Sequence, residues 1–285
     1  MKIAISGSTG LIGSTLSTMF SKEGHEVISM GRHDLYGKPD ELAEKIKAAN
    51  VVIHLAGAPI QQRWTAKNKE EIYNSRIVTT RNLVEAMGHM WEKPSLFLCA
   101  SAANIYPEAG AHTEASSARE TSFLGKVIRD WEAEAAKATM ICRTVHCRTA
   151  MVLSDKGGAL KTLLPPFRWG IGGRVGSGKQ IVSWIHIQDY AGIVKFLMGN
   201  DRISGPVNFS SPNPVTNAFL SKTLARTIHR PSVMVVPPIM LKLLYGKGSV
   251  VVVHGLEVLP DKVLKAGYRF RFPVLQDALE DLLDG

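Results

Sequence analysis

The sequence predicts an α/β protein in which a doubly wound parallel sheet carries a smaller C-terminal lobe. Three observations support this fold. A β-rich run, MKIAIS, opens the chain and leads through a glycine-rich turn into a helical stretch. Further β-rich runs, HEVISMG, NVVIHLAG and SLFLCASAA, alternate with segments of helical spacing, as in a doubly wound sheet. The 285 residues are 45% hydrophobic, which is enough apolar material for a core of this size.

The turn after the first strand, GSTGLIG, has the spacing of a dinucleotide-binding loop. Glycines there allow the tight turn, let the backbone approach a pyrophosphate and let the next helix pack closely, while the helix N-terminus attracts negative charge. An ordinary glycine turn is the alternative. The position between a strand and the helical stretch STLSTMFSKEG favours a Rossmann-type nucleotide site. We predict that the cofactor is held by Gly7, Ser8, Thr9, Gly10, Leu11, Ile12 and Gly13 and, at the end of VVIHLAG, by Leu55, Ala56 and Gly57.

The end of the second strand favours NADP(H) over NAD(H). An NAD site places Asp or Glu there to bind the ribose 2′-hydroxyl, and that carboxylate repels a 2′-phosphate. Met30 and Gly31 stand at this position instead. Arg32 follows, and its planar guanidinium can donate two hydrogen bonds to a phosphate, with His33 as a third donor. The alternative for Arg32 is a solvated loop residue.

The next stretch, between Arg32 and Asn50, is short. It has room for the helix DELAEKIKAA and for no more than a stub of a strand at HDLYG. A long helical stretch, KNKEEIYNSRIVTTRNLVEAMGHM, then joins the third strand to the fourth.

A second glycine-rich stretch, GRVGSGKQ, resembles a phosphate-binding P-loop at Gly173, Gly178 and Lys179. That loop needs Ser or Thr at its last position to bind Mg²⁺, and Gln180 stands there. The alternating IVSWIHI that follows predicts a strand in place of the required helix. We therefore interpret GRVGSGKQ as a glycine turn leading into a strand.

Composition excludes several classes of protein. The net charge of +9 is scattered without a basic block, so an anionic small ligand explains it better than a nucleic acid. No run of 18 apolar residues or leader segment appears, and we expect neither membrane insertion nor export. Cys99, Cys142 and Cys147 lie in apolar runs, as reduced thiols of a cytoplasmic protein would. The histidines lack metal-ligand spacing, and no metal site is predicted.

Longer motifs resemble the extended short-chain dehydrogenase/reductases, the sugar-nucleotide epimerase/dehydratase superfamily. GxxGxxG, VIHLAG and the strand before Tyr106 match its pattern. RWTAKNKEEIYNSRIVTTRNLVEA, DWEAEA, RTAMVLSDKGGAL, WIHIQD, GPVNFSSPNPVTN and VLPDKVLKAGYRFRFPVLQDAL resemble an atypical branch, the NAD(P)-binding epimerase-family proteins, which are also labelled cell-division inhibitors. The resemblance implies a Rossmann core over 1–155, rejoined by 183–211, and a substrate-side lobe over 156–182 and 212–285.

The resemblance also shows that the usual catalytic residues are missing. Ordinary members carry a Tyr and, four residues later on the same helix face, a Lys that lowers the Tyr pKa and holds the nicotinamide ribose. Alignment on DWEAEA puts Leu124 and Ile128 at these positions. The assisting Ser or Thr is replaced by Ala102, beside Ser101.

Other residues are candidates for the lost chemistry. Tyr106, with Lys126 or Arg129 near its hydroxyl, is the candidate acid or base, and a strand-capping Tyr is the alternative. Ser101 is the candidate assisting hydroxyl.

Substrate-binding candidates come from both halves of the chain. The segment after VIHLAG crosses the cofactor mouth in this fold and offers Arg63, Trp64 and Arg76, although Arg76 fits a surface ion pair with Glu70 or Glu71 equally well. Near WIHIQD, the candidates that face the cleft are Arg168, Lys179, His186 and Asp189, although a lone strand His is more often a core residue. The alternating Tyr268, Phe270 and Phe272 are interpreted as core.

Two functions remain open. The first is an NADP-dependent oxidoreductase or epimerase-like enzyme, acting without the usual pair on a small, anionic or nucleotide-linked substrate. The second is a non-catalytic NADP-binding sensor or regulatory protein linked to cell division, which the loss of the pair favours. Nucleic-acid binding through the net charge is a weaker third. Neither the substrate nor the oligomeric state follows from the sequence.

Overall fold

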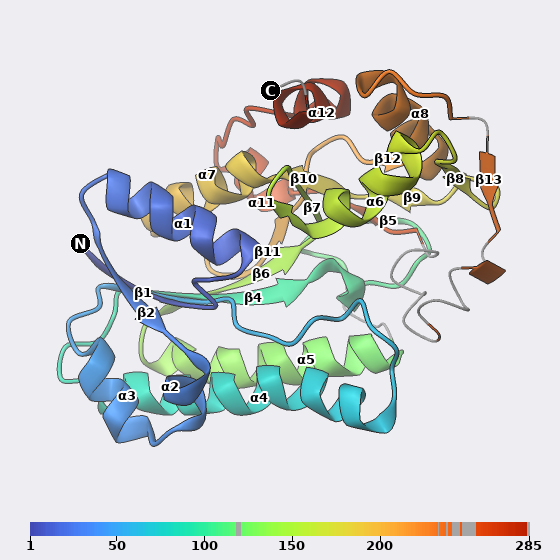
Figure 1. The fold of residues 1–285 in the computed structure, drawn as a ribbon. Helices are drawn as coiled ribbons and strands as arrows, with labels where there is room; N and C mark the ends of the chain where they lie inside the picture. Colours follow the sequence, from blue (N-terminus) through green and yellow to red (C-terminus); the bar gives the residue numbers. More distant parts are fainter. Residues whose placement is uncertain (118–120, 233, 238, 241–245, 247–254, 284–285) are drawn as a thin grey trace.

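A computed structural model describes residues 1–117, 121–232, 234–237, 239–240, 246 and 255–283. Its centre is a six-stranded sheet of order β11-β6-β4-β3-β1-β2, in which every neighbouring pair is parallel (Figure 1). The strands are β1 (Lys2–Ser6), β2 (Glu26–Met30), β3 (Val51–His54), β4 (Leu96–Ala102), β6 (Arg143–Thr149) and β11 (Gly205–Phe209). The predicted parallel α/β sheet is confirmed.

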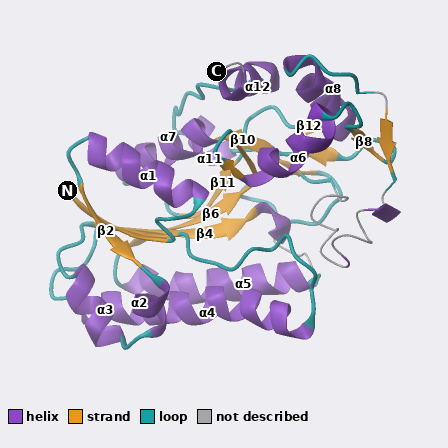
Figure 2. Ribbon diagram, viewed as in Figure 1, coloured by secondary structure: helices purple, strands orange, loops and turns teal. Residues whose placement is uncertain are grey.

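Helices cover both faces of this sheet (Figure 2). On one face lie α1 (Leu11–Lys22) and α7 (Ile187–Met198), which pack on Ile3 and Ile5. On the other lie α3 (Pro39–Ile46), α4 (Ala66–His89) and α5 (Phe123–Ala136), which pack on Ala4. Successive strand side chains point to opposite faces, so a strand buried on both sides must be apolar at every position. The runs IAI and VVI meet this requirement.

The segment from Gly31 to Ile46 holds two helices and no strand. The helix α2 (Arg32–Tyr36) begins directly after β2, so the stub of a strand expected at HDLYG is wrong. The Gly31 N–H donates to Asp34 Oδ2 at 2.7 Å, and Leu35 is buried against the α3 and α4 side of the sheet. A side chain that accepts the N–H group three residues before it, at the start of the same helix, favours a helical turn over an extended edge strand.

The small lobe is built around its own apolar core, which includes Leu153, Leu160, Trp184 and Leu220. Its helices are α6 (Gly158–Arg168), α8 (Asn217–Thr227) and α12 (Leu275–Leu283). Its short strands pair as β7 (Met151–Ser154) with β10 (Trp184–His186), β9 (Ile181–Val182) with β12 (Val215–Thr216), and β8 (Gly173–Val175) with β13 (Met234–Val236). Strands β7 and β10 fall within the ranges expected for the Rossmann core, 1–155 and 183–211, but they form a sheet of their own whose Leu153 and Trp184 pack in the small lobe. Between the two units lie β5 (Ala111–His112), its partner β14 (Glu257–Val258), and α11 (Asp261–Lys265), which packs near β11.

Two sequence expectations concern this lobe. GRVGSGKQ forms β8 and a turn with positive φ at Gly176 (57°) and Gly178 (71°), and β9 follows, so the predicted turn-to-strand is confirmed. The strand period of Tyr268 to Phe272 does not produce a strand. Asp189 holds this segment instead, because its carboxylate accepts the N–H groups of Arg271 and Phe272. Among the helices described, none is long and apolar enough to cross a bilayer.

Candidate functional site

The glycine turn between β1 and α1 forms a cradle that side chains would fill. Gly7 has φ of 67°, and a Cβ there would lie 3.1 Å from the backbone of Leu55 and Ala56. A Cβ on Gly13 would lie 2.1 Å from the Gly7 carbonyl oxygen. Gly10 caps α1 without a side chain, and the first turn holds no acidic residue. The first amides of α1 are therefore left for an external acceptor, and the helix dipole favours an anion.

A buried hydroxyl–imidazole chain fixes the end of β3 beside this cradle. Ser6 Oγ accepts the N–H groups of Leu55 and Ala56 and lies 2.7 Å from His54 Nδ1. With both amides donating to it, the hydroxyl donates to Nδ1, which places the imidazole proton on Nε2, 3.3 Å from Thr79 Oγ1. Burial and the nearby Arg76 lower the pKa of His54 to about 3, so the ring is neutral. The predicted Leu55–Gly57 segment is thus held rigidly at the edge of the sheet.

The end of β2 presents the residues predicted for the 2′-phosphate. Arg32 and His33 open α2, and both are exposed. The Arg32 guanidinium lies 3.6 Å from Glu71 Oε1 on α4, with three quarters of its side chain in solvent. A contact this long and this exposed holds the side chain weakly. Both donors are free to turn toward a ligand.

Arg76 on α4 is placed differently from either sequence interpretation. It is buried, and its guanidinium donates to the carbonyl oxygens of Ile72 and Ala58 and lies over the Trp131 ring. The guanidinium also lies 3.1 Å from where a Cβ on Gly57 would be. Arg76 therefore holds the loop after β3 in place through its bond to Ala58 and its contact with Gly57. It is neither the expected substrate clamp nor a surface partner of Glu70 or Glu71.

The other two residues of that loop lie nearer to solvent. Arg63 is exposed, and Trp64 is half-buried, with its indole N–H donating to the Ile60 carbonyl and its ring edge-on to Phe123. Their role in substrate binding stays a prediction.

The positions of the missing catalytic pair lie in an apolar cluster. Leu124 and Ile128 on α5 pack with Tyr106 and Val258, and Trp64 and Phe123 lie at its border. Neither side chain can transfer a proton, and their surroundings exclude a charged replacement. The family's usual site of acid–base chemistry is here an apolar contact.

Restoring the pair is therefore not expected to restore chemistry. In the double variant Leu124→Tyr and Ile128→Lys, an ammonium group would enter the apolar cluster without a partner, which costs several kcal/mol. We expect no gain of hydride transfer over the wild type in an absorbance assay with NADPH. The matched single variant Leu124→Tyr separates folding from charge, and turnover in the double variant would contradict the prediction.

Tyr106 does not pair with Lys126. The Tyr106 hydroxyl donates to Asn208 Oδ1 at 3.0 Å and accepts from Arg148 Nη1 at 2.8 Å, and its ring stacks on His112. Burial raises the pKa of Tyr106 more than Arg148 lowers it, so the phenol stays protonated at neutral pH. Lys126 is exposed on another face of α5 and bonds Asp130. The expected activation of Tyr106 by Lys126 is wrong, because the helix presents Leu124 and Ile128 toward the tyrosine.

The sequence analysis missed the ion pair at the centre of this region. Arg148 binds Glu132 through two parallel hydrogen bonds of 2.9 and 2.8 Å, and Ser101 donates to the same carboxylate at 2.5 Å. Burial raises the pKa of Glu132, but the bonds and charge of Arg148 outweigh this and lower it. Both groups are therefore charged. The signal was the position of Arg148 directly after Cys147 in an apolar run, where a buried charge requires a partner.

Strand register brings these groups to one edge. Ser101 on β4 and Asn208 on β11 are both aligned with Arg148 on the intervening β6, close to the carboxyl ends of the strands. Ligands of doubly wound sheets bind at this edge. Glu132 on α5 joins Ser101 to Arg148, and Arg148 and Tyr106 continue the polar chain to Asn208.

The small-lobe candidates separate into two groups. His186 is fully buried between β10 and α7, where Nδ1 accepts the Gln188 N–H and the ring lies against Phe272. His186 and Asp189 therefore have structural roles in place of the expected substrate contact, His186 in the core beside Asp281 and Asp189 as the acceptor of the Arg271 and Phe272 N–H groups. Arg168 and Lys179 are exposed, and their contact with substrate stays a prediction. The small lobe itself meets the cradle directly, since Leu11 and Ile12 pack against its core.

Fold and site together define a Rossmann-type dinucleotide-binding protein. Residues 3–209 match the NAD dependent epimerase/dehydratase family, and residues 236–282 match a domain of unknown function, DUF1731. The chain belongs to the NAD dependent epimerase/dehydratase family, which confirms its resemblance to the atypical extended short-chain dehydrogenase/reductases.

Relatives of similar length carry the same family name. Epimerase family protein YfhF of Bacillus subtilis is 34% identical over 99% of this chain and 98% of its own. Epimerase family protein MW0731 of Staphylococcus aureus is 34% identical over 98% of both chains.

Solved structures agree with the fold. Human epimerase family protein SDR39U1, in complex with NADPH, matches with a TM-score of 0.89 and 27% identity over 100% of this chain and 99% of that one. A nucleoside-diphosphate sugar epimerase from Corynebacterium glutamicum matches with a TM-score of 0.82 and 28% identity, over 99% of this chain and 58% of that one. UDP-glucuronic acid 4-epimerase from Bacillus cereus, with NAD, shares the fold at 18% identity. A nicotinamide cofactor is thus supported.

Proposed function

We propose that this protein is an NADP(H)-dependent oxidoreductase or epimerase-like enzyme that works without the Tyr–Lys pair. The observation that carries the proposal is the cradle at Gly7 and Gly13, with uncapped amides of α1 beside it and Arg32 at the end of β2. Glycines packed this closely on neighbouring backbone, with helix amides open beside them, fit a pyrophosphate-binding turn. The human relative in complex with NADPH supports the same cofactor.

The cofactor would be held by three groups of residues. Backbone amides of residues 7–13 would bind the pyrophosphate, the loop Leu55–Gly57 would border the adenosine half, and Arg32 with His33 would bind the 2′-phosphate. When bound, the nicotinamide donates or accepts a hydride.

Substrate polarisation would fall to the polar chain at the carboxyl edge of the sheet. Tyr106 stays protonated, so it would act as a hydrogen-bond donor and not as a base, and it would donate to a substrate oxygen once its hydroxyl turns away from Asn208 Oδ1. Arg148, which is held by Glu132, donates to that hydroxyl and fixes its position. The exposed Arg63, Arg168 and Lys179 would favour an anionic or nucleotide-linked substrate.

The alternative proposal is a non-catalytic NADP-binding sensor. It is favoured by the apolar packing of Leu124 and Ile128 against Tyr106, which leaves no general base in the family's usual place.

A hydride-transfer screen separates the two functions. Carbonyl compounds and nucleotide sugars would be tested with NADPH and NADP⁺ by cofactor absorbance, with wild type and Tyr106→Phe compared. We expect turnover of at least one substrate, with kcat reduced about 10²-fold in the variant, as for loss of one positioned donor. Cofactor binding without turnover of any compound would favour the sensor.

The cofactor preference gives a second, independent prediction. NADPH should bind at least ~10-fold more tightly than NADH, about 1.4 kcal/mol, which is within reach of one charge-assisted contact. Arg32→Ala should remove the preference in a direct titration. Glu71→Gln, which frees Arg32 from its weak partner, should strengthen NADPH binding and leave NADH unchanged. Equal affinities for both cofactors in the wild type would contradict the assignment.

A further inference from the structure

A cavity of about 600 Å³ opens on the small lobe, away from the sheet edge. It lies between α8, β8, residues 230–232 and β13. Its lining residues are Arg174, Ala218, Ser221, Lys222, Ala225, Arg226, Arg230, Ser232, Met234 and Val235. The volume is within the range of small-molecule sites.

The cavity is strongly basic. Arg174, Lys222, Arg226 and Arg230 contribute four cationic side chains, and no Asp or Glu is among the lining residues. Within the described part of the chain, none of the four forms an ion pair with a carboxylate. Four like charges around one hollow repel one another and attract an anion.

The bonds that two of these residues make orient them without neutralising them. Arg174 donates from Nη1 to the Ser177 carbonyl oxygen at 2.6 Å, and Arg226 donates from Nη2 to Gln276 Oε1 at 2.6 Å. Both acceptors are uncharged, so the guanidinium groups keep their full charge and further N–H donors. Guanidinium groups placed in this way bind phosphate through paired hydrogen bonds.

One wall of the cavity is apolar. Ala218 and Ala225 come from α8, and Met234 and Val235 come from β13, where about half of each of these two side chains is exposed. Exposed apolar groups beside cations fit a ligand that has an uncharged part as well as phosphates. A bare phosphate would leave this wall in water.

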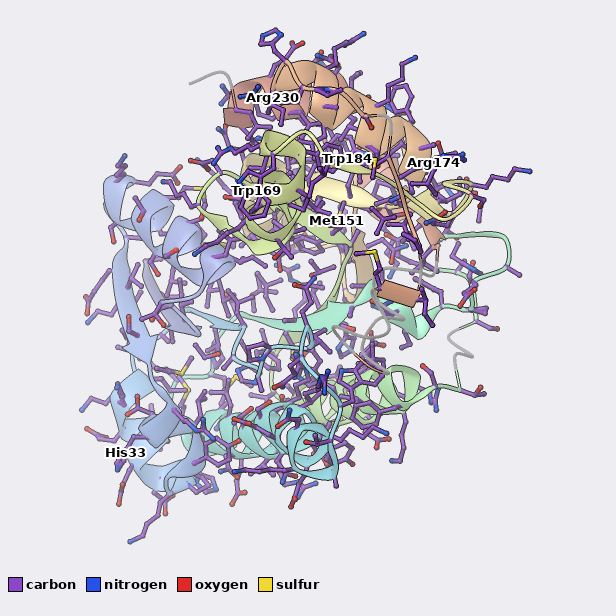
Figure 3. All side chains as sticks on the ribbon, turned by 45° about the vertical axis from the view of Figure 1, so that its right-hand side comes forward. His33, Met151, Trp169, Arg174, Trp184 and Arg230 are labelled. Carbon is purple, nitrogen blue, oxygen red and sulfur yellow. The ribbon has the colours of Figure 1, made fainter. Side chains whose placement is uncertain are left out.

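The cavity is separate from the cofactor cradle. None of its lining residues belongs to the glycine turn, the loop after β3 or the end of β2. Arg174 and Arg230 lie on the small lobe in Figure 3, whereas His33 marks the opposite end of the molecule. A ligand here would be a second one, bound independently of the dinucleotide.

We propose that this cavity is a binding site for a small diphosphate-bearing compound with an apolar or aromatic part. The arginines and Lys222 bind the phosphates, and Met234 and Val235 contact the uncharged part. The proposal does not depend on the redox function.

Calorimetric titration with inorganic pyrophosphate and with ADP at low salt tests the site, with and without saturating NADPH. Both probes are expected to bind, ADP more tightly, and NADPH is expected to change neither affinity. The double variant Lys222→Glu and Arg230→Glu should weaken both by at least ~10-fold, because both side chains are exposed and their replacement leaves the core intact. NADPH affinity should be unchanged.

The control is Lys161→Glu with Arg202→Glu, which makes the same change in net charge on exposed residues outside the cavity. It should bind both probes as the wild type does. Equal weakening in control and test variants would assign the effect to net charge and overturn the site. ADP binding that NADPH abolishes and the double variant leaves intact would place the probe in the cofactor cradle, which also overturns it. The absence of binding by both probes to the wild type would also overturn the site.

Discussion

Gly7→Val is expected to abolish NADPH binding while the protein remains folded. A valine here must adopt φ near 67°, at a cost of about 1–2 kcal/mol, and relief of this strain would displace the turn whose amides would bind the pyrophosphate. Its Cβ would also press on the Leu55 and Ala56 backbone, 3.1 Å away, which borders the adenosine half of the site. Fluorescence titration should show no saturation at NADPH concentrations 100-fold above the wild-type Kd.

Gly24→Val provides the matched control. Gly24 also has positive φ, 79°, but a Cβ there meets nothing within 4 Å. The Gly24→Val variant should lose about as much stability as Gly7→Val and keep full NADPH affinity. Normal affinity in Gly7→Val, or equal loss in both variants, would remove the cradle from the cofactor site.

Glu132→Ala is expected to lower the free energy of unfolding by about 3–5 kcal/mol, the largest effect on stability that we predict for a single side chain. The loss exceeds that of an ordinary ion pair because Arg148 would stay buried with its charge uncompensated. Ser101 and Tyr106 would lose their positions as well, since both bond this pair. Urea denaturation followed by circular dichroism measures the difference.

Two further variants separate the pair from its surroundings. Glu132→Ala with Arg148→Met removes both charges and should recover part of the loss, because no charge is left unpaired. Lys126→Ala breaks the exposed contact with Asp130 on the same helix and should change the free energy of unfolding far less, because solvent screens that contact. A loss in Glu132→Ala no larger than in Lys126→Ala would show that Arg148 is hydrated in the folded protein.

The glycine turn of the proposed cofactor site could be predicted because it is contiguous in the chain. Residues 7–13 form the turn by themselves: Gly7 adopts positive φ, the Gly10 N–H bonds the Gly7 carbonyl at 3.0 Å, and α1 begins at Leu11. Such geometry depends on residue types a few positions apart, which a sequence states directly. The position of Arg32 at the end of β2 was predictable for the same reason, although α2 replaced the expected stub of a strand.

The polar chain around Tyr106 could not be predicted in the same way, because its partners are distant in sequence. Tyr106 bonds Asn208, 102 residues away, and the choice of Arg148 over Lys126 as its neighbour depends on which face of α5 meets the sheet. Arg76 shows the same limit. Its helical position suited a surface ion pair, and the docking of α4 under the loop after β3 made it a core residue.

The sequence alone thus determined the parallel α/β class, the glycine turn between β1 and α1, the position of Arg32 directly after β2 and the absence of the Tyr–Lys pair. Each of these depends on local backbone preference or on residue identity at one position. Only the tertiary structure decided that Leu124 and Ile128 complete an apolar cluster, that Glu132 neutralises Arg148, and that four cations surround one cavity on the small lobe. Burial and charge pairing are properties of the space between elements, and strand register and helix docking fix that space only once the chain is folded.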